Sequence, residues 1–149
     1  MRLEEEHNGW ALALERGRVE MIQIDFRLSL LVSDGPNDRC WLRIETLSKF
    51  RTAEKQTLIV PERSATLAPA LSLFNVEVTA INIARVGHLE VTFGNGDRLE
   101  VAPDESYEAW QVECSTREGD MILVCPPGGD VVVFSRGRDP AYSAGPIMQ

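Results

Sequence analysis

Apolar and polar residues alternate with a period of two along most of the chain, which is the period of β-strands with one buried face. The alternating segments are rich in β-branched and aromatic residues, and clusters of Gly, Pro, Asn and Asp separate them. Trp10, Leu12 and Leu14 alternate with small or polar residues in the same way. Strands are predicted at residues 19–24, 26–32, 40–47, 76–86, 88–93, 98–102, 107–114, 121–125 and 130–134.

One short segment in the middle of the chain has a helical period instead. Its apolar residues follow the spacing i, i+3, i+4, i+7: Leu67, Ala70, Leu71 and Phe74. Thr66 can cap the N-terminus, Pro69 is tolerated in the first turn, and Asn75 can end the helix. The sequence therefore predicts an amphipathic helix of about two turns near residues 67–74.

The hairpin between residues 88–93 and 98–102 can be given a register from the alternation alone. A two-residue loop would set apolar side chains opposite polar ones throughout the hairpin. A three-residue loop, Gly94-Asn95-Gly96, instead pairs Val91 with Leu99 and puts its last glycine at the left-handed position of a bulged turn. We therefore expect the three-residue loop.

Together these elements predict a mainly β protein, a β-rich α+β fold in which an antiparallel sheet is curled or doubled and carries one short helix. Each half of the chain contains a strand, a hairpin with a glycine-containing loop and a closing strand, which is consistent with a duplicated β unit. Residues 1–135 are expected to form one domain. Residues 136–149 contain Gly, Pro and Ser without periodicity and are expected to be a flexible tail.

The chain has a net charge of −8, and this charge is concentrated in one half. Between Glu90 and Asp130 there are ten acids and two bases, whereas the remaining residues contain thirteen of each. An acidic half argues against nucleic acid or an anionic membrane as the partner, because phosphate groups are recognised by basic surfaces. No apolar run approaches the roughly 20 residues of a membrane span, and the acidic N-terminus does not resemble a secretory leader, so a cytoplasmic location is expected.

The three cysteines, Cys40, Cys114 and Cys125, are odd in number and show no CxxC or Cys/His spacing. This pattern argues against a disulfide framework and against a structural zinc site. We expect all three to be small buried hydrophobic residues.

The search for catalytic chemistry gives no strong candidate. Asp104, Glu105 and Glu108 are close enough in sequence for general acid/base work, but their neighbours are typical of a solvated loop. The calcium-loop spacing, the serine nucleophile elbow and the phosphate-binding glycine loop are all missing from the sequence. No catalytic residue, metal ligand or cofactor is therefore predicted, and an enzymatic role is disfavoured.

Two motifs in the second half carry a family resemblance. These are a P-x-x-x-Y-E-A-W segment, Pro103 followed by residues 107–110, and a Pro-Gly-Gly at residues 127–129 before the last strand. They resemble a family of small bacterial, mainly actinobacterial proteins classed as a domain of unknown function. The sequence departs from that pattern at Phe134, where a tryptophan is expected, and in its extended tail. The resemblance implies no catalytic residues. By analogy with small acidic domains that accompany toxin systems, it implies a binding role such as immunity.

The leading hypothesis is a non-enzymatic protein-binding domain, of the kind that inhibits a bacterial toxin as an immunity protein, with an acidic surface for a basic partner. The acids are expected to gather on one outer surface. The alternative is a small-ligand-binding domain or enzyme with a pocket in a curled sheet. A structural subunit, for example a homodimer, is a third option. The direction of the Trp110 ring is left open. The candidate partner-binding residues are Glu90, Glu100, Asp104, Glu105, Glu108 and Trp110.

Overall fold

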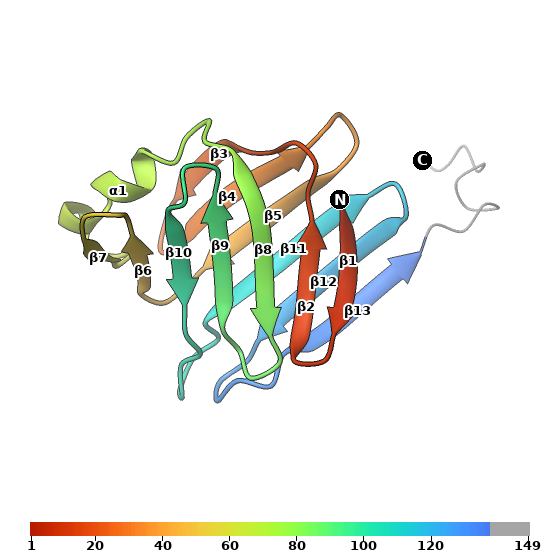
Figure 1. Ribbon diagram of the computed structural model, residues 1–149. Helices are drawn as coiled ribbons and strands as arrows, with labels where there is room; N and C mark the ends of the chain where they lie inside the picture. The colour runs from red at the N-terminus through yellow and green to blue at the C-terminus, as the bar shows by residue number, and fades with distance from the viewer. Residues whose placement is uncertain (138–149) are drawn as a thin grey trace.

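Two antiparallel β-sheets lie face to face in the computed structural model, which describes residues 1–137 (Figure 1). The first sheet, sheet A, has the strand order β1 (Arg2–Glu6), β2 (Gly9–Ala13), β8 (Val78–Ala84), β9 (Leu89–Phe93), β10 (Arg98–Val101), β6 (Ser48–Arg51) and β7 (Gln56–Ile59). The second, sheet B, has the order β13 (Val132–Gly137), β12 (Gly119–Cys125), β11 (Trp110–Thr116), β5 (Arg39–Ile44), β4 (Leu28–Asp34) and β3 (Gly17–Ile24). The prediction of a mainly β, antiparallel, doubled sheet is confirmed.

The core fills the space between the sheets, because the alternation along each strand points its apolar side chains inward. In β9 the side chains of Leu89, Val91 and Phe93 are buried, whereas the residues between them are partly exposed. The rings of Phe50 and Phe93 meet edge to face with centroids 6.4 Å apart. Each sheet therefore contributes one apolar face to a single shared core.

The predicted hairpin register is confirmed. Val91 lies opposite Leu99, and Leu89 lies opposite Val101. The loop is closed by hydrogen bonds from the Phe93 N–H to the Asp97 carbonyl and from the Gly96 N–H to the Phe93 carbonyl, both 2.9 Å. Gly96 has φ of +92°, the left-handed conformation that favours glycine.

The predicted helix is shorter than expected. Its α-helical part, α1, is the single turn Ala68–Leu71, and it follows the 3₁₀ turn η1, Ser64–Thr66. A single turn cannot present a stripe that repeats at i+7, so Leu71 and Phe74 are 57% and 61% exposed. The expected cap is also wrong, because the Thr66 hydroxyl accepts a hydrogen bond from the N–H of Val60 in the preceding loop.

Cys40 and Cys114 form a disulfide, so the expectation of three unpaired cysteines is wrong. The two residues lie directly opposite each other on the paired strands β5 and β11. They are 74 positions apart in the sequence, and only the pairing of two distant strands brings them together. Cys125 is free and buried, as predicted.

Three strands were not predicted. These are β1, whose sequence is strongly acidic, and the short strands β6 and β7. The two three-stranded meanders β3–β4–β5 and β8–β9–β10 lie in different sheets, so each sheet contains strands from both halves of the chain. β13 continues to Gly137, two residues past the expected domain boundary, and the rest of the expected tail, 138–149, lies outside the described residues. Within residues 1–137 no helix is long and apolar enough to cross a membrane.

Candidate functional site

A cleft of about 850 Å³ opens at one end of the sandwich, where four connections between strands meet. They are the β3–β4 turn, the β5–β6 connection, the segment after β7 and the β10–β11 loop. We call this the end cleft. It is lined by Phe26, Glu45, Thr46, Leu47, Leu58, Val60, Glu62, Arg63, Ala102, Pro103, Asp104, Tyr107 and Glu108.

Hydrogen bonds fix the β10–β11 loop, which supplies one wall of the end cleft. The Asp104 carboxylate accepts hydrogen bonds from the backbone N–H groups of Ser106 and Tyr107, at 2.8 and 3.0 Å. The Asp104 carbonyl accepts another from the Gly128 N–H at 2.7 Å, which ties the loop to the β12–β13 turn. An aspartate that turns its own backbone in this way gives a loop a defined shape. Asp104 therefore shapes the wall.

Glu45, the residue after β5, lies against Glu108 of the β10–β11 loop. The Glu45 N–H donates to the Ala109 carbonyl at 2.9 Å, so the end of β5 runs beside the end of the loop. A hydrogen bond between the carboxyl groups of Glu45 and Glu108, then burial, then repulsion by the Glu108 charge raise the pKa of Glu45 from 4.5 to about 7. The Glu108 carboxylate also accepts a hydrogen bond from the Gln111 side chain at 2.9 Å. At neutral pH Glu45 is therefore protonated in part, beside Glu108.

The rim of the end cleft is apolar and exposed. Phe26 is 84% exposed and Tyr107 is 70% exposed, and both rings border the cavity. Leu47 and Leu58 add two half-exposed aliphatic side chains. Single exposed apolar residues are ordinary, but several around one cavity are typical of a binding surface. The buried Thr46 hydroxyl has no hydrogen-bond partner, and it lines the same cavity.

The structure separates the six candidate residues of the sequence into three groups. Asp104 and Glu108 line the end cleft, and Glu105 is exposed on the same loop. Glu90 and Glu100 lie opposite each other on the outer face of sheet A, where Glu100 pairs with Arg51 at 3.3 Å. The third group is Trp110 alone.

Trp110 belongs to the core. Its side chain is fully buried, and its indole Nε1–H donates to the Gly87 carbonyl at 2.8 Å. The free thiol of Cys125 lies beside the same carbonyl, at 3.6 Å. Burial, followed by the nearby Glu108 charge, raises the pKa of this thiol. The ring direction that the sequence left open is therefore inward, because the place of Trp110 on β11 points the ring between the sheets.

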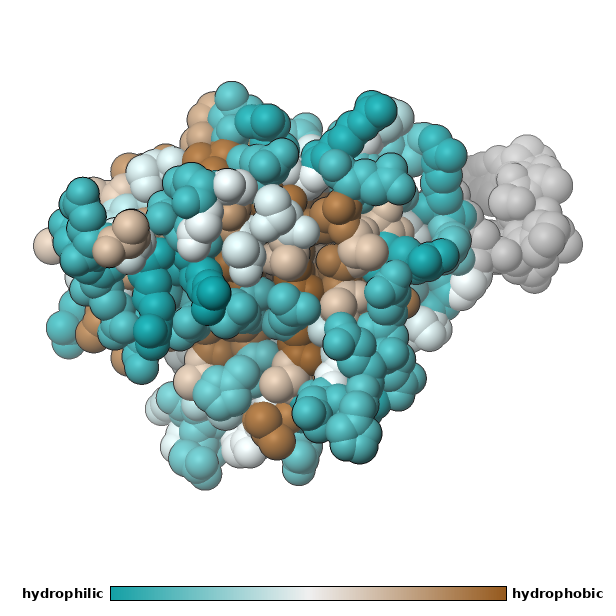
Figure 2. Space-filling model, viewed as in Figure 1, coloured by the Kyte–Doolittle hydropathy of each residue, from teal (hydrophilic) through white to brown (hydrophobic). Residues whose placement is uncertain are grey.

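The acids of the second half do not share one surface. Glu90 and Glu100 face outward from sheet A, whereas Glu113 faces outward from sheet B and pairs with Arg43 at 3.2 Å. Figure 2 shows that the outer face of sheet A is itself mixed, with apolar surface along its middle, over β2 and β8, between hydrophilic margins. Alternation sends polar side chains outward from both sheets, so a charge gathered in one half of the sequence is distributed around the fold.

Glu45 was missed by the sequence reasoning. It lies at the end of a predicted strand, 63 positions before Glu108, and only the β5–β11 pairing brings the two together. No local pattern marks such a pair.

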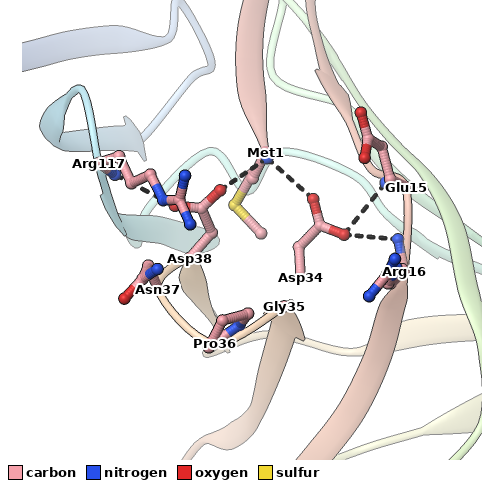
Figure 3. Close-up of a pocket in the computed structure, with 9 residues that line it drawn as sticks. All are labelled: Met1, Glu15, Arg16, Asp34, Gly35, Pro36, Asn37, Asp38 and Arg117. Carbon is pink, nitrogen blue, oxygen red and sulfur yellow. Dashed lines mark hydrogen bonds and ion pairs between the residues drawn. The ribbon is translucent and has the colours of Figure 1, made fainter.

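A second cavity of about 300 Å³ is occupied by ion pairs (Figure 3). The buried Asp34 carboxylate accepts hydrogen bonds from the backbone N–H groups of Glu15 and Arg16, at 3.0 and 2.6 Å, and lies 2.9 Å from the Met1 ammonium. Asp38 accepts from the same ammonium at 2.8 Å and from the Arg117 N–H at 3.1 Å. Burial acts to raise the pKa of Asp34, but these hydrogen bonds outweigh it and the pKa is lowered. Because Asp34 and Asp38 both pair with the Met1 ammonium, their contacts in this cavity stabilise the fold.

These features define a class of protein: a domain of two antiparallel β-sheets with an acidic cleft at one end, rimmed by aromatic side chains. The chain belongs to a family of unknown function, DUF6188, whose sequence model matches residues 10–135 and so includes every residue of the end cleft. The expected resemblance to a domain of unknown function is confirmed. No significant match was found among curated proteins or solved structures. Among residues 1–137 no group of three His, Cys, Asp or Glu side chains is placed to hold a metal ion.

Proposed function

We propose that this protein is a non-enzymatic binding domain whose end cleft holds a cationic side chain, lysine or arginine, of a basic protein partner. The observation that carries the proposal is the Glu45–Glu108 pair, two carboxyl groups in contact within an open cavity. Two adjacent carboxylates repel each other, and a cation between them removes the repulsion. The site therefore gains more from a cation than an isolated carboxylate would.

The charge of the cleft supports a cationic ligand. Four acids and one base line it: Glu45, Glu62, Asp104, Glu108 and Arg63. A concave site lined by one sign of charge concentrates its field and attracts ions of the opposite sign. Glu105, on the same loop, extends the negative charge beyond the cavity.

The apolar rim supports a long side chain in place of a simple ion. Lysine and arginine carry aliphatic stems that pack on apolar surface while the charged group reaches polar partners. Phe26 and Tyr107 present exposed rings at the rim, and aromatic faces attract ammonium and guanidinium groups. Tyrosine and arginine are also enriched at the centres of protein interfaces. A toxin neutralised by an immunity-type inhibitor is one such basic partner.

A free small cation is the second candidate. The cavity of about 850 Å³ lies within the range of small-molecule sites, roughly 300–1,000 Å³. The two candidates share the same recognition chemistry. They differ in whether affinity comes mainly from the cleft or from a larger surface around it.

The test is an NMR titration of the uniformly labelled protein with n-butylguanidinium, with neutral n-butylurea as the matched control. We expect the cation to shift the backbone signals of residues 45–47 and 102–109, and the urea to leave them in place. Glu108→Gln should weaken the cation by at least about fivefold, because it removes one carboxylate of the pair. Glu90→Gln, the same change on the outer face of sheet A, should leave its affinity unaltered.

Equal shifts with the two compounds would show that the cleft does not select for charge, and the proposal would be wrong. Capture from the native cell then separates the two candidates. A basic protein retained by the wild type and lost with Glu108→Gln supports a protein partner. A low-molecular-weight amine that co-purifies with the wild type alone supports the second candidate.

A further inference from the structure

β13 is an edge strand that lacks the usual protection within residues 1–137. The two sheets have four edge strands in the described part of the chain: β1, β7, β3 and β13. Native proteins protect such strands with charges, bulges or covering elements, because their unpaired backbone groups invite another strand. β1 carries one arginine and three glutamates, β3 has a bulge between Val19 and Met21, and β7 has α1 beside it (Figure 1). β13 has a single charged residue, Arg136.

The outer face next to this edge is apolar. Phe134 is 60% exposed, Val132 is 42% exposed and Ile122 of β12 is 39% exposed. Ile122 lies opposite Phe134, and Val124 lies opposite Val132. The edge strand and its neighbour therefore form two short apolar rows that end at the open side of the sheet.

We propose that β13 pairs antiparallel with β13 of a second copy of this chain, about a two-fold axis at Val133. In this register Val132 of one copy lies opposite Phe134 of the other. Each apolar row then continues across the axis, from Ile122 and Phe134 of one copy to Val132 and Val124 of the other. The two six-stranded sheets join into one continuous sheet.

Charge favours a second copy over an unrelated strand. Asp130 lies two residues before β13, and Arg136, which lies opposite Asp120 of β12, is near its end, so this edge has an acidic side chain at one end and a basic one at the other. A two-fold axis at Val133 places the Asp130 end of each copy beside the Arg136 end of the other. The contact is therefore self-complementary in charge as well as in apolar surface. It lies apart from the end cleft and does not depend on its function.

The first test is sedimentation equilibrium of the full chain over a range of concentrations. We expect a monomer–dimer equilibrium that Phe134→Lys weakens at least tenfold, because it places a charge in the apolar row. Phe74→Lys is the matched control, since Phe74 is 61% exposed and lies three residues after α1, which lies at the opposite end of the molecule from β13 (Figure 1). Both variants change an exposed side chain, and circular dichroism should show both folded.

A wild type that stays monomeric up to about 100 µM overturns the proposal, as does equal weakening by the two variants. A dimer that forms only after truncation at Gly137 also overturns it, because the rest of the chain then covers the edge.

The second test fixes the register. Val133→Cys places two cysteines directly opposite each other across the axis, within the Cα separation of about 4.4–6.8 Å that a disulfide needs. Phe134→Cys places its pair on the diagonal, about 7–8 Å apart. Mild oxidation should cross-link the first variant at least tenfold faster than the second. A faster cross-link in the second variant would contradict the proposed register.

Discussion

Glu45→Gln should stabilise the protein at alkaline pH, and the effect should disappear in acid. Folding holds Glu45 against the Glu108 carboxylate and raises its pKa from 4.5 to about 7. A group whose pKa is raised on folding binds more protons in the folded state, so an acid of this kind loses stability as pH rises between the two values. Glutamine keeps the shape and can still donate a hydrogen bond to Glu108, but it cannot ionise.

The size of the effect follows from the same pKa difference. The change from 4.5 to about 7 corresponds to about 3 kcal/mol in a site closed to water. The end cleft is open, and solvent screening reduces this to about 1 kcal/mol. We therefore expect Glu45→Gln to unfold at higher urea concentration than the wild type at pH 8, by about 1 kcal/mol in free energy of unfolding. The two proteins should coincide at pH 4.

Urea unfolding of a double-mutant cycle checks the cause. In a Glu108→Gln background the repulsion is already gone, so adding Glu45→Gln should change the stability by less than about 0.3 kcal/mol at pH 8. If Glu45→Gln were neutral or destabilising at pH 8, the carboxyl pair would not store this repulsion. The same gain in both backgrounds would place its origin outside the pair.

Four further predictions concern the end cleft, the Trp110 side chain, the disulfide and the Asp34 ion pair. If n-butylguanidinium binds the ionised pair, its affinity should fall about tenfold between pH 8 and pH 6, because Glu45, with a pKa of about 7, takes up a proton. Calorimetry at several pH values measures the affinity. Trp110→Phe replaces the buried indole with a smaller ring and removes its hydrogen bond to Gly87. It should lower the free energy of unfolding, measured in urea, by about 3 kcal/mol. A change below about 1 kcal/mol would contradict the burial of the indole. Replacing both Cys40 and Cys114 with alanine opens a loop of 74 positions and should cost about 4 kcal/mol in the chain-entropy model, while mass spectrometry of unreduced peptides tests whether the bond exists. Asp34→Asn should destabilise the protein at pH 7, where the Asp34 carboxylate, with its lowered pKa, is ionised in both the folded and the unfolded state. The loss of stability should shrink as pH falls below 3.8 through the folded pKa. A loss of stability that does not depend on pH would refute the role of this charge.

Local patterns in the sequence predicted the elements whose partners are close by. The 88–102 hairpin is an example, because the parity of Val91 and Leu99 and the turn glycine are enough to set its register. The helix was overestimated, since a spacing of four apolar residues does not show that the chain turns away after Leu71. The charged strand β1 was missed because backbone pairing to β2 forms it, with little apolar burial of its own.

The candidate site could be predicted only in part. Asp104 and Glu108 belong to a loop that the sequence singled out, and both line the end cleft. Their partner Glu45, like the Cys40–Cys114 bond, depends on the pairing of β5 with β11. Long-range strand pairing is set by the packing of the whole core, and no spacing within one segment encodes it.

The proposed function requires that Glu45, beside Glu108, holds a proton near neutral pH and gives it up when a cation binds. Carbon-detected NMR measures it directly, by following the Glu45 carboxyl signal as pH is varied, with Glu45→Gln to assign the signal. We expect a midpoint near 7 in the free protein and a lower midpoint with saturating n-butylguanidinium. A midpoint near 4.5 in the free protein, or one that the cation leaves unchanged, would contradict it.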